Sequence, residues 1–190
     1  SYHNYRDTDI DTYVEASQAL VDRGYWVIRM GKAMHKRLSL QHQRVIDYPF
    51  VEDQDDLMDI WLSVNCRFFV ATASGIDTVP WVYGKPPVVY VNALPLSLCA
   101  SPINNIWAPK HLRWKDSGRL LTLKEHCQHG YGHTIEYEQA GIAVEDLSPA
   151  EITAAVTECE QRVAGTWVET KEDQDRQQRF WAALRNWPDF

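Results

Sequence analysis

The fold is decided by one short stretch, in which an apolar run leads directly into a Ser-Gly pair: Phe68-Phe69-Val70-Ala71-Thr72-Ala73-Ser74-Gly75-Ile76-Asp77. The run at 67–72 is apolar on both of its alternating faces, which is typical of a strand covered by helices on both sides. Residues 75–83 predict a helix bent at Pro80, and a second apolar run follows at 87–91. This order of strand, helix and strand predicts a right-handed βαβ unit with parallel strands.

The same alternation continues upstream. There the hydrophobic periodicity predicts a helix at 9–23, strands at 25–30 and 44–47, and a helix at 54–65. In the last of these helices the apolar residues Leu57, Ile60, Trp61 and Val64 fall on one face. By this pattern we expect most of the eight tryptophans in the core. The upstream half therefore predicts an α/β fold, with a Rossmann-like parallel sheet sandwiched by helices.

Downstream of Asn92 the regular alternation of predicted strands and helices ends. Residues 93–121 are rich in proline and turn residues, and we expect them to be irregular. Helix start signals then return: Thr122 with Glu125, and Ser148 with Glu151, each have the spacing of a capping box. They predict helices at 122–128 and 148–164, followed by a charged helix at 171–187. We expect two units, an α/β domain at 1–147 and a C-terminal helical segment at 148–190 packed on it.

Composition excludes several classes of function. The net charge of -7 makes sequence-independent nucleic-acid binding a poor hypothesis, because such binding depends on clustered Lys and Arg. No apolar run approaches the ~20 residues that a membrane span needs. The four cysteines are widely spaced without a C-x-x-C pair, which argues against a zinc ribbon or a disulfide scaffold and favours a reducing cytoplasm. The sequence also lacks Walker A, G-x-G-x-x-G and G-x-S-x-G motifs.

Residues 126–133 concentrate His and Cys side chains that zinc accepts as ligands. Two glycines interrupt the helix that would align His126 with His129, so we expect neither a metal nor a cofactor there. Trp107 and Trp114 lie in the irregular region, where they are candidates to stack on a sugar or a base.

Polar and glycine residues follow each predicted strand. In an open parallel sheet, ligands bind outside the carboxyl ends of the strands. Those ends are followed by Gly31-Lys32, Asp47-Tyr48, Thr72 to Gly75, and Asn92. At the Ser74-Gly75 corner, unpaired helix N–H groups, the helix dipole and the missing glycine side chain all suit a phosphate. The alternative is that Ser74 is only an N-cap.

The corner resembles the donor site of two-domain (GT-B type) glycosyltransferases. In heptosyltransferases and the fucosyltransferase group, a strand, a Ser/Gly turn, a helix, Gly-x-Pro and a strand follow one another, and here Gly84-Lys85-Pro86 supplies the Gly-x-Pro. Residues 2–92 are also similar to a bacterial family of glycosyltransferases, most specifically in Arg29-Met30-Gly31 and Ser74-Gly75. The resemblance implies that residues 1–147 are the nucleotide-sugar-binding half of a GT-B enzyme, which transfers a sugar to a glycan acceptor in surface polysaccharide assembly.

The resemblance also implies roles for single residues. Ser74 and Gly75 would meet the donor pyrophosphate, and Gly31 would let the ribose approach. Asp59 matches a base-contacting position, where its carboxylate would accept from guanine N1–H and N2–H and favour a GDP-sugar; the alternative is a solvated residue in an acidic turn. Arg29 would pair with phosphate, or form an ion pair with Asp47, which lies on the same rim. Metal dependence is usually absent from this architecture.

One departure from the family concerns the start of the domain. Related fucosyltransferases begin it with a strand that carries His-x-Arg, whose Arg grips the diphosphate. The chain starts at Ser1, past that strand, so we expect a longer polypeptide that also supplies the N-terminal acceptor domain. Arg6 is a candidate substitute for the missing Arg. The sequence assigns no catalytic base, since in GT-B enzymes the base often comes from the other domain.

Two other functions fit the same residues. The chain could be a nucleotide-binding or protein-interaction module that has kept the fold without the chemistry. It could also be half of a sugar-nucleotide epimerase, which uses a similar Ser-Gly corner and needs catalytic acids in both halves.

Overall fold

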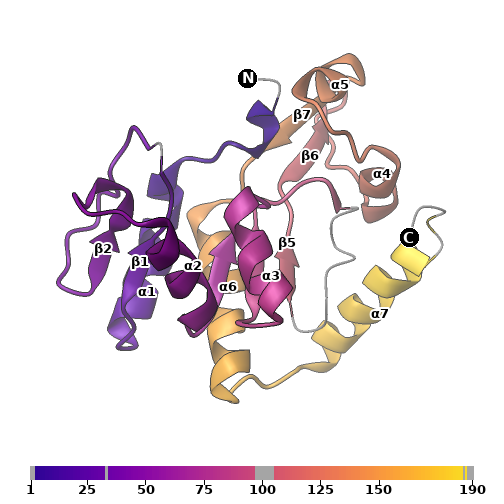
Figure 1. Cartoon of the computed structure of the whole chain (residues 1–190). Helices are drawn as coiled ribbons and strands as arrows, with labels where there is room; N and C mark the ends of the chain where they lie inside the picture. Colours follow the sequence, from indigo (N-terminus) through magenta and orange to yellow (C-terminus); the bar gives the residue numbers. More distant parts are fainter. Residues whose placement is uncertain (1–2, 33, 97–104, 186, 188–190) are drawn as a thin grey trace.

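The computed structural model describes residues 3–32, 34–96, 105–185 and 187, and shows an α/β protein (Figure 1). Its parallel strands form two sheets, which share no strand pairing within the described residues. In the smaller sheet, β1 (Val27–Arg29) pairs with β2 (Val45–Asp47). In the larger one, β4 (Val88–Val91) lies between β3 (Phe69–Ala71) and β5 (Ile106–Ala108). The register places Phe69 beside Val88, and Val89 beside Ile106.

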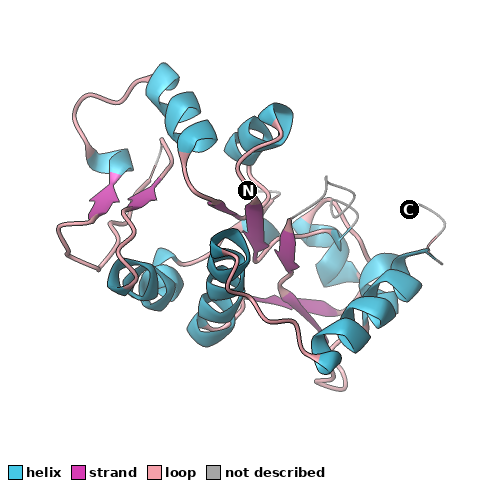
Figure 2. Cartoon of the chain, turned by 90° about the horizontal axis from the view of Figure 1, so that it is seen from below, coloured by secondary structure: helices cyan, strands magenta, loops and turns pink. Residues whose placement is uncertain are grey.

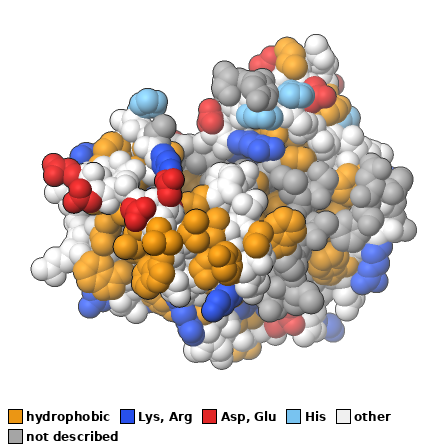
Figure 3. All heavy atoms as spheres, in the orientation of Figure 1, with side chains coloured by type: hydrophobic (Ala, Val, Ile, Leu, Met, Phe, Trp, Pro, Cys, Tyr) orange, Lys and Arg blue, Asp and Glu red, His pale blue; other side chains and the backbone are white. Residues whose placement is uncertain are grey.

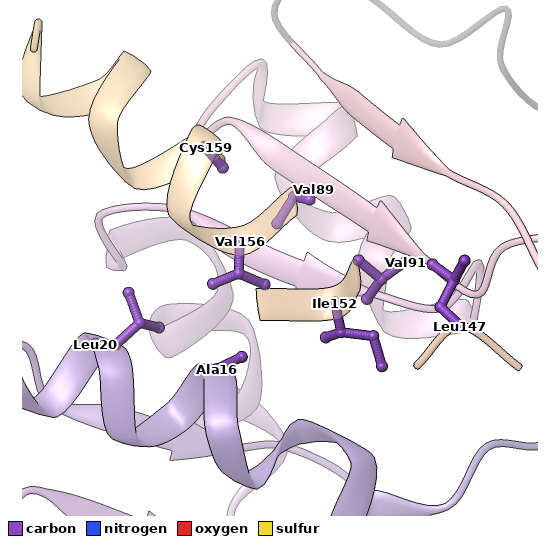
Figure 4. Packing of buried hydrophobic residues seen from close by; sticks show 8 residues of the cluster. All are labelled: Ala16, Leu20, Val89, Val91, Leu147, Ile152, Val156 and Cys159. Atoms are coloured by element: carbon purple, nitrogen blue, oxygen red, sulfur yellow. The ribbon is translucent and has the colours of Figure 1, made fainter. Parts of the chain in front are cut away.

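Helices cover the three-stranded sheet on both sides (Figure 2). On one side, α1 (Val14–Asp22) and α6 (Pro149–Ala164) pack together against Val89 and Val91 of β4, both fully buried. Figure 4 shows Leu20, Ile152 and Val156 converging on these two valines. On the other side lie α2 (Asp56–Asn65) and α3 (Thr78–Tyr83), which contact each other. Burial of β4 on both faces explains why every residue of this strand is apolar.

A second, smaller cluster lies beyond the carboxyl end of the parallel sheet. There β6 (His111–Trp114) pairs antiparallel with β7 (Ile142–Glu145), and α4 (Leu123–Gln128) and α5 (Thr134–Gln139) connect them. Its core consists of Leu94, Leu112, Leu121, Tyr137 and Ile142, joined by Tyr5 from the N-terminal segment. The last helix, α7 (Lys171–Arg185), contacts α4. Short 3-10 helices complete the chain: η1 (Asn4–Arg6), η2 (Ile10–Tyr13), η3 (Tyr48–Phe50) and η4 (Gly75–Asp77).

The prediction of the first four strands, and of the helices at 9–23, 54–65, 122–128, 148–164 and 171–187, is confirmed within a few residues. The helix predicted at 75–83 begins as the 3-10 turn η4 and continues as α3. The prediction that residues 93–121 are irregular is wrong for their described part, because β5 and β6 lie there; residues 97–104 lie outside the described residues. The strands β5 and β6 lie among proline and turn residues, which suggested an irregular segment, and β5 is held in the sheet by pairing with β4.

The apolar face of α2 points to solvent, although its periodicity suggested a core-facing stripe. Leu57 and Trp61 are 70% and 57% exposed, whereas Ser63 is fully buried and donates to the Asp59 carbonyl at 2.7 Å. The expectation that the tryptophans lie mostly in the core is also wrong, since Trp26, Trp61, Trp81 and Trp181 are exposed. Periodicity shows that a helix has an apolar face but not what that face meets.

No helix in the described ranges is both long and apolar enough to cross a membrane.

Candidate functional site at the carboxyl edge of the strands

A groove of about 380 Å³ opens beyond the carboxyl ends of β1 and β3. Its lining comes from three segments: Gly31 and Lys32 after β1, Asp56, Asp59 and Ile60 in the first turns of α2, and Ile76 in η4. The chain passes from β1 out to β2 and then returns to β3, β4 and β5 on the opposite side (Figure 1). A reversal of this kind is where open α/β sheets bind ligands.

Gly31 is fixed by its backbone conformation. Its φ of 139° is one that side chains rarely adopt, and a Cβ there would lie 2.7 Å from Cε of Met34. The glycine therefore lets the chain turn sharply out of β1 with Met34 close against it. A larger residue at position 31 would strain this backbone conformation and push the Met34 side chain aside.

The acidic end of α2 forms the opposite wall. Asp55 caps the helix by accepting from the Leu57 N–H at 3.1 Å. Asp56 forms an ion pair with Lys32, and this hydrogen bond raises the pKa of the Lys32 ammonium. Asp59 adds a second carboxylate, so the lining carries two acids and one base. Such a wall accepts hydrogen bonds from N–H and O–H groups more readily than it binds a phosphate.

The Ser74-Gly75 corner adjoins the groove through Ile76. Ser74 is exposed and occupies the N-cap position of η4, but its hydroxyl caps no N–H group of the described chain. A Cβ on Gly75 would meet no described atom within 4 Å, so the surface beside it is open. The preceding Ala73 has a left-handed φ of 58°, which is uncommon for a residue with a side chain and clusters at functional sites.

Asp77 is a candidate that the sequence reasoning missed. It is only 5% exposed, and its Oδ2 has no hydrogen-bond partner within the described chain. Burial raises the pKa of the Asp77 carboxyl to about 6, against the opposing effects of the Ser74 N–H and the Arg6 charge. The Ser74-x-x-Asp77 spacing is the signal that could have found it, since an acid at that position reaches back to an N-cap backbone.

Arg6 lies close enough to Asp77 for its positive charge to lower the pKa of that carboxyl. Its Nε donates to the Tyr5 hydroxyl at 3.0 Å, and its guanidinium lies over the Tyr5 ring. Its remaining donors make no hydrogen bond or ion pair to the described residues. A cation with free donors thus stands near the Ser74-Gly75 corner.

Arg29 and Asp47 form an ion pair, which is one of the two roles that the sequence allows for Arg29. Arg29 Nη1 donates to Asp47 Oδ1 at 3.1 Å and to the Lys36 carbonyl at 2.7 Å, and Asp47 Oδ2 accepts from the Leu38 N–H at 2.9 Å. The two side chains are 12% and 15% exposed. They hold the loop between β1 and β2 against its strands, and neither lines the groove.

Asn92, at the carboxyl end of β4, is also tied into the fold. It is fully buried, accepts from the Leu147 N–H at 2.7 Å and donates to the Tyr13 hydroxyl at 3.4 Å. Trp107 stacks on Tyr90 with ring centroids 4.2 Å apart, so one face of its ring is already occupied. Trp114 meets His129 edge to face and donates to Glu125 at 3.4 Å. The structure thus gives Asn92 and both tryptophans internal partners.

A larger hollow of about 610 Å³ lies elsewhere, between β5, α6 and the start of α7. Its charged lining residues are engaged within the chain: Glu158 pairs with Arg162, Arg176 with Glu172, and Asp173 caps α7 through Thr170. It lies beside β5 and α6 and not at the carboxyl ends of β1 and β3, where open α/β sheets bind ligands.

Within the described ranges, no group of three or more His, Cys, Asp or Glu side chains is placed to hold a metal ion. In the histidine-rich segment, burial lowers the pKa of His126 to about 4, so that imidazole is neutral at pH 7.

Fold and site together define an α/β protein with an open groove at the carboxyl edge of its parallel strands, lined by apolar surface together with two acids and one lysine. No protein-family model matches the chain, and neither a curated protein nor a solved structure matches it significantly.

Proposed function

We propose that this chain binds the nucleoside diphosphate of an activated sugar and serves as the donor-binding, GT-B type half of a glycosyltransferase. The observation that carries the proposal is the groove where the chain reverses between its two parallel sheets. Its volume lies within the range of small-molecule sites, about 300–1,000 Å³. Gly31 and Asp59, which the resemblance assigns to the ribose and the base, both line it.

The charged residues support one orientation of the nucleotide along the carboxyl edge of the strands. The acidic wall at Asp59 suits the N–H donors of guanine and the ribose hydroxyls. The diphosphate then lies toward Ser74 and Gly75, where the surface is open and Arg6 has donors to spare. Arg29 keeps its place in the ion pair with Asp47 and supports the loop that carries Gly31.

The test is a thermal-shift and calorimetric titration of the chain with GDP, UDP and ADP. A ligand that binds only the folded state adds about 2.7 kcal/mol of stability at a hundredfold excess over Kd. We expect GDP to bind most tightly, and Asp59→Asn to weaken GDP at least tenfold while leaving UDP and ADP little changed.

Gly75→Ala provides the matched steric probe. Its φ is not left-handed and its Cβ would enter open space, so the fold should tolerate the change while a ligand in close contact would not. Gly132→Ala is the control, because a Cβ there also meets no described atom within 4 Å and lies far from the groove in sequence. Equal binding by both variants, or no binding of any nucleotide by the parent chain, would overturn the proposal.

A further inference from the structure

An extended apolar surface covers α2 and α3. Figure 3 shows hydrophobic side chains gathered over these two helices. The α2–α3 apolar patch consists of seven large side chains that are 42–76% exposed: Leu57, Met58, Ile60, Trp61, Trp81, Val82 and Tyr83. Three of them are aromatic, a composition enriched in the centres of protein interfaces.

The patch is larger than an isolated monomer normally exposes. A large aromatic side chain buries about 150–250 Å² when covered, so the seven residues at these exposures offer on the order of 700 Å². The largest apolar patch on a typical monomer is about 300–600 Å². A standard protein interface buries about 800 Å² on each partner, which this patch and its rim together can supply.

The two ends of the patch carry opposite charge. Glu52, Asp53 and Asp55 are exposed at the amino end of α2. Arg67 follows the carboxyl end of α2, and Lys85 follows that of α3. Because β3 and β4 are parallel and Phe69 pairs with Val88, Arg67 and Lys85 both lie at the amino edge of the sheet. Arg67 donates to the Val163 carbonyl of α6 on the opposite face, so the exposed Lys85 is the cation that borders this end of the patch. Figure 3 shows acidic side chains at the upper left of the patch and basic ones beneath it.

We propose that the α2–α3 apolar patch is the interface of a homodimer with twofold symmetry. A twofold rotation perpendicular to the helices places the acidic end of one patch against the basic end of the other, so the surface is complementary to itself. The apolar side chains of the two copies then bury each other. Ile60 belongs both to the patch and to the groove lining, whereas Trp61 and Val82 do not line the groove. Substitutions at Trp61 and Val82 therefore test the interface separately from the proposed nucleotide binding.

The test measures the mass of the chain by sedimentation equilibrium from about 1 to 100 µM, a range chosen because interfaces of this size bind with micromolar or tighter affinity. We expect a dimer that Trp61→Glu and Val82→Asp each weaken at least tenfold. Both positions are exposed, so circular dichroism should show an unchanged fold. Val168→Asp is the matched control, because Val168 is 80% exposed and lies outside the patch.

Charge reversal tests the orientation. Lys85→Glu alone should raise the Kd for dimerisation several-fold, because it sets like charges against each other. Combining it with Glu52→Lys reverses both ends and should recover most of the loss. A monomer at 100 µM, or a dimer that Trp61→Glu and Val168→Asp affect equally, would overturn the proposed interface. A dimer that binds no nucleotide would overturn the proposed function and leave the interface standing.

Discussion

At the scale of single residues, the Asp77 carboxyl stands out because its environment favours the neutral form. It is buried beside the Ser74-Gly75 corner, and Oδ2 is without a hydrogen-bond partner in the described chain. Burial outweighs the backbone N–H groups and the Arg6 charge, so its pKa rises from 3.8 to about 6. The folded chain therefore binds more protons than the unfolded chain between about pH 4 and pH 6.

We expect this single group to reduce stability as the pH rises. The stabilising contribution of the neutral carboxyl is complete below pH 4 and is lost as the pH passes 6, by about 2–3 kcal/mol in total. Asp77→Asn, which stays neutral, should thus gain that amount relative to the parent chain between pH 4 and pH 7.5. Urea unfolding at both pH values measures it, with exposed Asp53→Asn as the control. A difference between variant and parent that stays constant with pH would contradict the assignment.

The sequence predicted part of the candidate site for identifiable physical reasons. Gly31 was expected on the rim because it follows the first predicted strand, whereas Asp59 was singled out only by the resemblance to glycosyltransferases; both lie in the groove. Asp77 was missed because one acid in an acid-rich chain carries no sign of burial. The sequence did not decide whether Arg29 binds phosphate or pairs with Asp47. Asp47 is 18 residues away and meets Arg29 only because β1 and β2 pair.

At the scale of elements, α6 shows how strongly local signals fix a helix. Ser148 accepts from the Glu151 N–H at 3.3 Å, while the Glu151 carboxylate accepts from the Ser148 N–H at 2.8 Å. These contacts need only three residues of spacing, so they are readable in the sequence. The strands β5 and β7 carry no comparable local start signal and are held by pairing with β4 and β6. The sequence also did not show that the apolar face of α2 points to solvent, since periodicity does not reveal what a helix face packs against.

Removal of the α6 cap should destabilise the whole fold, because this helix supplies much of the first core cluster. We expect Ser148→Ala to lower the free energy of unfolding by about 1 kcal/mol, the usual cost of a lost N-cap. Urea unfolding monitored by circular dichroism measures the change. Ser117→Ala, at an exposed turn position, is the control. Equal urea midpoints for Ser148→Ala and Ser117→Ala would show that the cap does not contribute to stability.

At the scale of the whole molecule, the N-terminal segment connects the two core clusters. Tyr5 is 3% exposed within the cluster of β6 and β7, and its N–H donates to Thr134 Oγ1 at 3.2 Å. A few residues later, Tyr13 packs against the cluster of α1 and α6. Between them, buried Lys110 donates to the Asp7 carbonyl and to Asp146. The segment therefore fixes the smaller unit against the parallel sheet.

Tyr5→Ala should remove much of this connection. Truncating a buried aromatic side chain costs about 3–5 kcal/mol, and we expect the amides of β6 and β7 to lose hydrogen-exchange protection before those of β4. Trp26→Ala is the control, because Trp26 is a large aromatic residue that is 62% exposed. Uniform loss of protection across all strands would mean that the two clusters unfold as one unit.

The packing of α1 on α6 has a consequence for biosynthesis. The Tyr25 hydroxyl donates to Glu160 across 135 positions of the chain. At about 5–20 residues per second on the ribosome, α6 is synthesised roughly 7–27 s after α1. Throughout that interval the apolar face of α1, with Ala16, Leu20 and Val21, lacks the cover that α6 provides. We therefore expect the core around α1 to be completed only after α6 has been synthesised, because α6 supplies Ile152, Val156 and Cys159 to it.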